Sequence, residues 1–292
     1  MRNDDVRPLR SVLYMPASNA RAMDKARGLD ADALVFDLED AVAPEAKVDA
    51  RARLRQEVAR GGFGHRRLIA RINALSTEWG ALDLAALACA PVEAILAPKV
   101  GGEADVVRLS REMDRLGFPA ATGLWVMIET PAAVLALERI AATAGSTRLA
   151  GLVLGLNDLA KDTGMEQTPG REGFVPIMVN AVLAARAVGI AVIDGVCNAI
   201  DDPGRIEGEA RQARALGFDG KSLIHPAQIA PVNTVFAPAE ADIEEARAII
   251  AAFEDPDNAG NGALRVNGKM AELLHLTQAR RTIARAAAIA GR

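Results

Sequence analysis

Residues 124–142 read LWVMIETPAAVLALERIAA, and this stretch indicates the fold. Its first five residues are apolar without alternation, which is typical of a parallel strand buried on both faces. Glu129 and Thr130 follow, and Pro131 then opens an amphipathic segment, at a position where the missing N–H of proline costs a helix nothing. The stretch therefore predicts a strand–loop–helix unit with a carboxylate at the end of the strand.

The same unit recurs along the rest of the chain. Segments that read as helices, such as 43–60, 132–142 and 203–216, separate short apolar runs. Eight alternating strands and helices in a chain of this length are the pattern of a (β/α)₈ TIM barrel. The competing fold, a doubly wound open sheet, normally carries a GxGxxG turn after its first strand, and none stands there. The predicted strands are 11–15, 33–38, 68–72, 94–98, 124–128, 149–156, 190–194 and 221–224.

Residues 1–253 are predicted to form the barrel domain, with its last helix at 239–253. Residues 254–268, EDPDNAGNGALRVNG, read as a linker or a hairpin that leads to a final helix near 271–290. A segment beyond a closed barrel must pack outside it. We therefore expect 254–292 to be a helical extension that packs on its own subunit or on a neighbouring one.

Composition excludes several classes of function. The 34 basic and 38 acidic residues leave a net charge of −4, and aromatic residues are only 3%, so no nucleic-acid surface is expected. No apolar run is long enough to span a membrane. The charged first ten residues show no signal peptide, and Cys89 and Cys197 form no disulfide framework or CxxC motif. We expect a cytoplasmic protein with two ordinary buried thiols.

Charged side chains gather where the predicted strands end. In a TIM barrel these ends meet at the C-terminal face, where the active sites of this fold form. Clustered carboxylates repel one another unless a cation is present. Glu129 and Asp158, on neighbouring strands, are the best ligand pair for Mg²⁺, with Mn²⁺ as the alternative. Asp37 can reach this metal through water, Asp194 ends a further strand, and Arg71 offers a planar fork for a carboxylate or an enolate oxygen.

Each of these residues also has a structural interpretation. Glu129 and Asp158 can satisfy N–H groups at helix starts, and Arg71 can pair with one of the acidic residues that follow strand 33–38. Lys99 ends another strand, but acidic surroundings would keep it protonated, so a Schiff-base lysine is not expected. His225 precedes a proline and reads as a turn residue.

Several short motifs occur in a fixed order over nearly the whole chain, together with Arg21 and Lys25. They are RSVLYMP (10–16), FDLEDAV (36–42), RIN (71–73), MIETP (127–131), LGLNDL (154–159), IDGV (193–196), LGFDGKSLIHP (216–226) and GKM (268–270). With these motifs the chain resembles the citrate lyase beta-subunit and malyl-CoA lyase family, within the HpcH/HpaI aldolase superfamily. Each motif alone is weak, but the set is specific.

The resemblance implies a barrel that holds Mg²⁺ through Glu129 and Asp158 and acts on coenzyme A thioesters, with Arg71 at the substrate carbonyl. Tyr14, Arg21 and Lys25 are then candidates for binding the phosphates of coenzyme A, against the alternative of a solvated helix face.

The resemblance also implies a homotrimer or hexamer in which the C-terminal segment covers the site of a neighbouring subunit. Many members carry an aspartate acid/base two residues after the methionine of the Gly-x-Met motif. This chain has Glu272 there, with a reach one methylene longer.

The expected activity is that of an oxo-acid lyase. We expect Mg²⁺-dependent retro-Claisen cleavage of malyl-, citramalyl- or citryl-CoA to an acyl-CoA and a 2-oxo acid, with Asp37, Arg71 and Glu272 as catalytic residues. The alternatives are a malyl-CoA thioesterase on the same fold, a metal-dependent 2-oxo acid aldolase without coenzyme A, and a non-catalytic barrel subunit.

Overall fold

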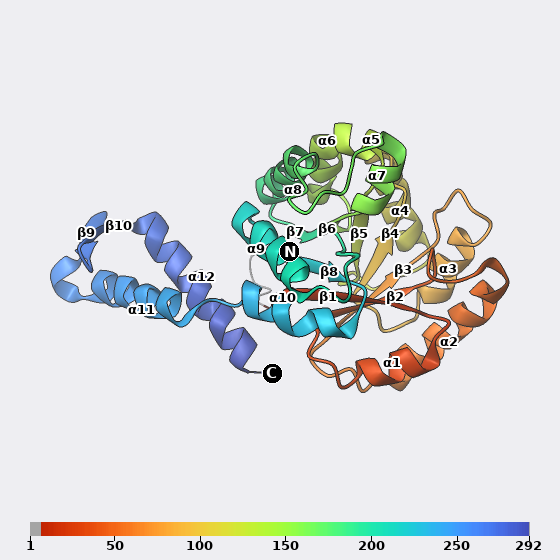
Figure 1. The fold of residues 1–292 in the computed structure, drawn as a ribbon, viewed down its shortest axis with the longest axis horizontal. Helices are drawn as coiled ribbons and strands as arrows, with labels where there is room; N and C mark the ends of the chain where they lie inside the picture. Colours follow the sequence, from red (N-terminus) through yellow and green to blue (C-terminus); the bar gives the residue numbers. More distant parts are fainter. Residues whose placement is uncertain (1–6, 292) are drawn as a thin grey trace. The chain divides into compact units, whose positions relative to one another are not determined.

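Eight parallel strands close into a barrel in the order of the sequence, within residues 7–291, which are those that the structure describes (Figure 1). The structure is a computed structural model. The predicted fold class is confirmed, and so are the eight predicted strands, with small shifts at their ends. They are β1 (Ser11–Pro16), β2 (Ala33–Asp37), β3 (Arg67–Arg71), β4 (Ala94–Ala97), β5 (Gly123–Ile128), β6 (Leu149–Leu154), β7 (Ala191–Asp194) and β8 (Gly220–Leu223).

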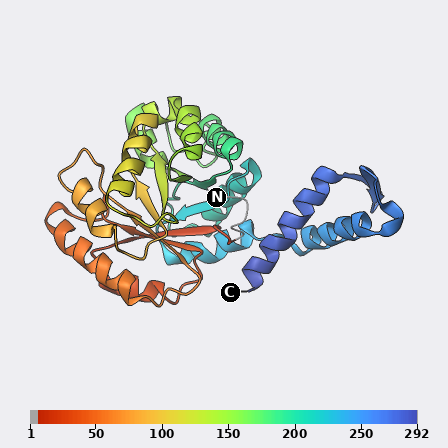
Figure 2. The same cartoon turned by 180° about the vertical axis from the view of Figure 1, so that it is seen from behind.

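Helices surround these strands, as the views from the front and from behind show (Figure 1, Figure 2). Local sequence sets their ends: the Asp202 side chain accepts a hydrogen bond from the Arg205 N–H at 2.9 Å at the start of α9, and Gly217, with a φ of 97°, ends that helix. The helices of the barrel are α1 (Ala20–Ala26), α2 (Lys47–Arg60), α3 (Gly80–Leu87), α4 (Glu103–Arg115), α5 (Pro131–Leu135), α6 (Leu137–Ala142), α7 (Leu156–Thr163), α8 (Val175–Val188), α9 (Pro203–Leu216) and α10 (Ile229–Phe236).

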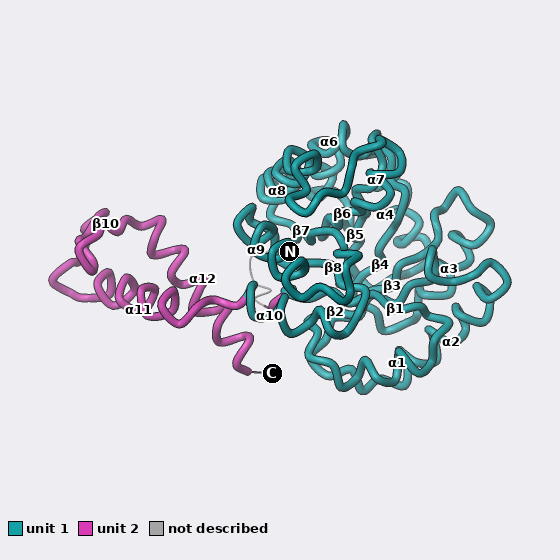
Figure 3. The backbone as a smooth tube through the Cα atoms, in the orientation of Figure 1, with its two compact units in different colours: residues 1–2, 9–236 teal, residues 3–8, 237–292 magenta. Residues whose placement is uncertain are grey.

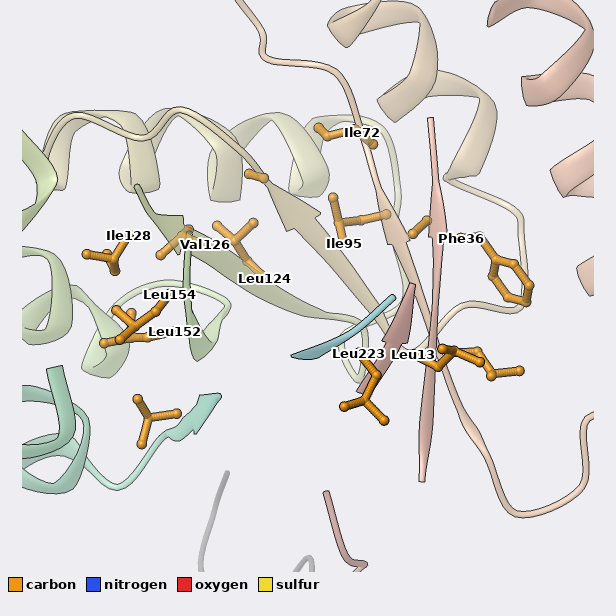
Figure 4. Packing of buried hydrophobic residues seen from close by; sticks show 14 of the residues in the cluster. Leu13, Phe36, Ile72, Ile95, Leu124, Val126, Ile128, Leu152, Leu154 and Leu223 are labelled. Atoms are coloured by element: carbon orange, nitrogen blue, oxygen red, sulfur yellow. The ribbon is translucent and has the colours of Figure 1, made fainter. Parts of the chain in front are cut away.

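Alternate residues of each strand point to opposite faces of the barrel wall. One set, which includes Leu13, Phe36 and Ile95, packs against the helices; Figure 4 shows members of this outer layer on several strands. The other set fills the barrel interior and includes Val35 and Met127. A charged residue at the end of a strand therefore faces either the interior or the helices, according to its place in this alternation along the strand.

The chain divides into two compact units (Figure 3), with the boundary between residues 236 and 237. The C-terminal unit contains α11 (Glu240–Glu254), β9 (Ala263–Val266), β10 (Lys269–Glu272) and α12 (Leu273–Ala290). The predicted boundary after residue 253 lies near the end of α11, whereas this division falls before that helix. The predicted hairpin is present: β9 and β10 pair antiparallel through Asn267 and Gly268, with φ angles of 49° and 82°, as in a tight two-residue turn.

The structure bears on two expectations, the burial of the two cysteines and the lack of a membrane-spanning segment. Cys197 is buried as expected, but Cys89 is exposed, so the prediction of two buried thiols is wrong for Cys89. None of the described helices combines the length and the apolar character that crossing a bilayer requires. Residues 1–6 of the charged N-terminal segment lie outside the described part of the chain.

Candidate active site

Arg71 is held at the C-terminal end of β3 by its neighbour in the sheet. Asp37 of β2 and Arg71 are directly paired in register. Arg71 Nε donates to Asp37 Oδ1 at 2.7 Å and Nη2 donates to Oδ2 at 2.6 Å, a bidentate ion pair. Asp37 also accepts the backbone N–H groups of Glu39 and Ala41 at 2.8 and 3.1 Å. Both oxygens of Asp37 thus accept hydrogen bonds, and Asp37 orients Arg71; its reach to a metal through water stays a prediction.

Glu39 is the second carboxylate on this guanidinium. Arg71 Nη1 lies 2.7 Å from Glu39 Oε2, while Asp40 is 4.0 Å away. Burial raises the pKa of Glu39 to about 8, and the charges of Asp40, Glu129 and Asp37 add to this, while Arg71 opposes it. Burial alone would lower the pKa of Arg71, but Asp37 and Glu39 hold it above its ordinary value. The site therefore carries a permanent cation beside a carboxyl group that stays largely protonated near neutral pH.

Tyr14 lies beneath this cation and not where we had expected it. The Arg71 guanidinium is 5.4 Å from the centre of the Tyr14 ring, and the Tyr14 hydroxyl is buried beside Ser222. Burial raises the pKa of Tyr14 above its ordinary value. A buried hydroxyl is not placed to bind a phosphate at the surface. The contact with Arg71 makes Tyr14 a support for the guanidinium.

Glu129 and Asp158 converge on one cationic group. Glu129, which follows β5, is fully buried and accepts the Lys99 N–H at 2.7 Å through Oε1. Asp158 stands in the first turn of α7 and not at the strand end, because β6 stops at Leu154. The Lys99 ammonium lies 2.7 Å from Asp158 Oδ2 and 3.5 Å from Glu129 Oε1. The structure thus brings the two predicted ligands to the same point.

The protonation of this group follows from its surroundings. Burial raises the pKa of Glu129, whereas the N–H and the charge of Lys99 lower it. Burial would lower the pKa of Lys99, but the hydrogen bond to Asp158 and the charges of Glu129, Glu39 and Asp158 raise it. Lys99 is therefore held as an ammonium, as the argument against a Schiff-base lysine required.

A glycine gives Glu129 its space. A Cβ at Gly155 would lie 2.4 Å from Glu129 Cβ and 2.7 Å from its Oε2. Met127, two residues earlier on β5, reaches towards Arg71, whose Nη1 is 3.7 Å from the Met127 sulfur. The arginine and the carboxylate pair thus belong to one site.

The residues present fit a divalent cation. Glu129 Oε2 is buried and has no hydrogen-bond partner, so one oxygen of the pair is free to bind a cation. Among the described residues, no group of three or more His, Cys, Asp or Glu side chains is arranged to hold a metal. Two carboxylates are nevertheless what Mg²⁺ typically takes, because its other ligands are water and substrate oxygens.

A buried polar network that the sequence reasoning missed positions the loop after β2. Lys47 Nζ donates to the carbonyl oxygens of Leu38 and Glu39 at 2.9 and 3.0 Å and to Asn73 Oδ1 at 2.7 Å. Asn73 Nδ2 in turn donates to Asp83 Oδ2 at 2.6 Å. These residues fix the loop that carries Glu39. Lys47 lies among other charged residues on α2, so nothing in the sequence pattern marked it as buried. Asp83 is the one charged residue of the otherwise apolar helix α3, a pattern that does indicate a buried polar contact.

Asp194 faces away from this site. Its carboxylate pairs with Arg171 at 2.8 Å and Lys221 at 2.8 Å, and Lys221 also contacts Glu209 at 3.0 Å. Asp194 is in phase with Val192, which packs in the outer layer. The expectation that it joins the other carboxylates at the C-terminal face is therefore wrong.

The remaining candidates lie on other parts of the chain. Arg21 and Lys25 are exposed on α1, so a role in phosphate binding stays a prediction. Glu272 is the last residue of β10 and the N-cap of α12, not a residue within the helix; its N–H donates to His275 Nδ1 at 2.9 Å. His225 Nδ1 accepts the Ala227 N–H at 3.2 Å, as a turn residue does.

A closed eight-stranded barrel with charged side chains gathered at the C-terminal ends of its strands is typical of TIM-barrel enzymes. The chain belongs to the HpcH/HpaI aldolase/citrate lyase family, whose sequence model matches residues 10–226. The resemblance inferred from the motifs is thereby confirmed.

Individual relatives match almost the whole chain. A (3S)-malyl-CoA thioesterase of Cereibacter sphaeroides is 46% identical over 97% of this chain and 96% of its own length. The citrate lyase subunit beta of Escherichia coli K12 is 33% identical, with 96% and 94% covered. The crystal structure of CitE from Mycobacterium tuberculosis in complex with magnesium, acetoacetate and coenzyme A has a TM-score of 0.75 at 29% identity, covering 97% of this chain and 99% of that one. A citrate lyase beta subunit complexed with oxaloacetate and magnesium, also from M. tuberculosis, has a TM-score of 0.69 at 30% identity, covering 80% and 99%.

Proposed function

We propose that this chain is a Mg²⁺-dependent enzyme acting on the coenzyme A thioester of a short 3-hydroxy acid that carries a second carboxylate, with malyl-CoA as the first candidate. The observation that carries the proposal is the convergence of Glu129 and Asp158 on one ammonium group, in the same site as Arg71. Relatives named for malyl-CoA, and similar structures that hold magnesium, coenzyme A and oxo acids, support the substrate class.

The residues divide the chemistry between them. Glu129 and Asp158 would hold the metal, which when bound supplies a Lewis acid that favours ionisation of the substrate hydroxyl. Arg71, oriented by Asp37, stabilises negative charge that develops on the substrate carbonyl oxygen. Glu39 keeps a proton beside Arg71 near neutral pH and can exchange it with the substrate.

We propose thioester hydrolysis as the net reaction and carbon–carbon cleavage as the second candidate, which reverses the order of the sequence analysis. The 46% identity to proteins named malyl-CoA thioesterase favours hydrolysis. In hydrolysis water attacks the thioester carbonyl, the C–S bond breaks, and malate and the thiol of coenzyme A are released. In cleavage the hydroxyl loses its proton, the C–C bond breaks to give glyoxylate and the enolate of acetyl-CoA, and the enolate takes up a proton to become acetyl-CoA. The likeness to citrate lyase beta subunits favours this second outcome.

Product analysis separates the two reactions. Purified protein is incubated with malyl-CoA and Mg²⁺, and malate, free thiol, glyoxylate and acetyl-CoA are measured. Malate and free thiol in equal amounts, without glyoxylate, support hydrolysis, whereas glyoxylate and acetyl-CoA support the lyase. Glu129→Gln should abolish either activity. Full activity after exhaustive chelation would contradict the metal dependence.

Substitution of Arg21 and Lys25 tests the role of coenzyme A. Replacing both by glutamine should raise KM for the thioester if they bind its phosphates. An unchanged KM, together with turnover of a free 2-oxo acid substrate, would favour the aldolase alternative. Absence of any turnover would favour the non-catalytic subunit.

We further propose that the chain forms a homotrimer or hexamer in which Glu272 completes a neighbouring site. Met270, Leu273 and Leu274 flank Glu272 and are exposed, which is unusual for three large apolar side chains in one short segment. Burial against a second copy would remove them from water. A cytoplasmic location remains our expectation.

A further inference from the structure

Lys99 has an unusual backbone for a lysine. Its φ is 53°, in the left-handed region that residues with a Cβ rarely adopt. This conformation directs its N–H to Glu129 Oε1 at 2.7 Å, while its side chain returns to the same carboxylate pair. Disfavoured backbone that the surrounding structure maintains tends to cluster at functional sites.

The main-chain contact and the side-chain contact of Lys99 differ in how easily they can be broken. The N–H contact is made by the main chain to a carboxylate that is fully buried. The ammonium contact is made by the mobile end of a side chain that is 35% exposed, to Asp158, which is 24% exposed. Lys99 can therefore release Asp158 and still hold Glu129.

A divalent cation shared by Glu129 and Asp158 would conflict with this ammonium. The ammonium hydrogen-bonds Asp158 Oδ2 at 2.7 Å, and two cations a few ångströms apart repel each other strongly. Room for the displaced side chain exists nearby. A pocket between the loops after β3 and β4 is lined by Lys99 itself, Asn73 and Asp105, whose carboxylate also pairs with Arg108 at 3.2 Å.

We propose that the Lys99 ammonium is a stand-in cation that holds Asp158 towards Glu129 in the metal-free protein and is displaced when Mg²⁺ binds, so that Lys99 sets the affinity of the site for the metal. The inference rests on the proposed metal site and deepens it. Lys99 is in this sense a positioning residue, because it acts through the two carboxylates.

The test is the affinity of the substrate-free protein for Mg²⁺, measured by isothermal titration calorimetry. Lys99→Met keeps an unbranched side chain, one atom shorter, and removes its charge, so Mg²⁺ should bind at least about tenfold more tightly. The melting temperature without metal should fall, and its rise on adding Mg²⁺ should exceed that of the wild type. Lys161→Met is the matched control: Lys161 lies on α7 near Asp158 and loses the same charge, but it is exposed and does not contact the pair. Its affinity should stay within about twofold of the wild type, because exposed charges are screened.

The outcomes distinguish this inference from the proposed function. If Glu129→Gln abolishes Mg²⁺ binding while Lys99→Met leaves it unchanged or weakens it, the stand-in role is overturned and the metal site stands. If Glu129→Gln leaves Mg²⁺ binding intact, the metal site and the stand-in role both fail. An equal gain in Lys161→Met would also overturn the stand-in role, because any nearby charge would then suffice.

Crystal structures of the wild type with and without Mg²⁺ keep the inference testable if Lys99→Met does not fold. The Lys99 ammonium should hydrogen-bond Asp158 in the metal-free crystal and lie away from it in the loaded one. An ammonium that still donates to Asp158 beside bound Mg²⁺ would overturn the proposal.

Discussion

Arg71 is the residue on which most of the site's charge balance depends. It neutralises the buried Asp37 and lies 2.7 Å from the largely protonated Glu39, and it is our candidate for the group that stabilises charge developing on the substrate. Arg71→Ala should lower kcat about 10²-fold or more, as loss of an oxyanion donor does. It should also destabilise the fold by ~3–5 kcal/mol, because the buried Asp37 carboxylate loses its cation.

Steady-state kinetics and urea unfolding measure the two effects separately. Arg71→Lys is the control, since it keeps the charge but loses the planar fork that matches Asp37. A loss of only a few-fold in kcat for a folded Arg71→Ala protein would remove Arg71 from the mechanism.

Ionisation of Glu39 should make the free energy of unfolding depend on pH. Its pKa is about 8 in the folded protein and near 4.5 when unfolded. Between these values the folded state keeps a proton that the unfolded state loses, so the contribution of Glu39 to stability is complete below pH 4.5 and is lost as pH rises towards 8. The difference in unfolding free energy between the wild type and Glu39→Gln should therefore fall by up to ~1.4 kcal/mol per pH unit over this window and level off above it.

Urea unfolding of both proteins from pH 5 to 9 measures this difference, in which the other titrating groups cancel. A difference that does not vary with pH would show that Glu39 ionises normally.

At the scale of the elements, the end of β6 makes room for the site. Gly155 has no left-handed backbone strain, yet a Cβ there would meet Glu129 at 2.4 Å. Gly155→Ala should displace Glu129, weaken Mg²⁺ binding and destabilise the fold by ~1–3 kcal/mol through overpacking. Gly208→Ala is the control: Gly208 lies inside α9 with nothing near its missing Cβ, so alanine should stabilise the protein by about 0.5–1 kcal/mol. Thermal melts measure the stability of both variants, and calorimetry measures their affinity for Mg²⁺. Equal effects of the two substitutions would contradict the steric argument.

The elements were largely predictable from the sequence because strand burial, proline and glycine are local signals. The apolar runs marked all eight strands, and the segment predicted as a helix over 203–216 is α9. The order of the strands then brought Asp37, Arg71 and Glu129 to one face. The error over Asp194 has a physical reason: it is in phase with Val192, which packs in the outer layer, and a strand that is apolar on both faces does not reveal this phase in the sequence.

The parts of the site that escaped prediction depend on non-local contacts. Nothing near Lys47 in the sequence reveals that its ammonium is buried against Asn73, some 26 residues further along the chain. The double contact of Lys99 likewise arises only when the loop after β4 meets β5 and α7. The sequence shows which side chains are charged, but the residues that they contact are determined only when the barrel closes.

At the scale of the whole molecule, the proposed role of Glu272 requires a second copy of the chain. If each barrel borrows Glu272 from a neighbour, Arg71→Ala and Glu272→Ala proteins are each inactive but can complement one another. A mixed oligomer then contains sites that pair an intact Arg71 with an intact Glu272. Co-expression in equal amounts should restore about a quarter of the wild-type activity, because half of the barrels and half of their neighbours are intact. If Glu272 serves its own barrel, every site in the mixture lacks one residue and no activity returns.

The exposed apolar residues beside Glu272 supply the control for this experiment. Leu274→Glu in both chains should prevent assembly and abolish the restored activity, because burying the new charge against a neighbour is costly. Leu135→Glu is the matched substitution: Leu135 is 88% exposed on α5 of the barrel, away from the C-terminal unit in sequence, and should leave complementation intact. Size-exclusion chromatography with light scattering reports assembly, and product formation from malyl-CoA reports activity. Complementation that survives Leu274→Glu, in an oligomer of unchanged mass, would show that this apolar segment does not hold the subunits together.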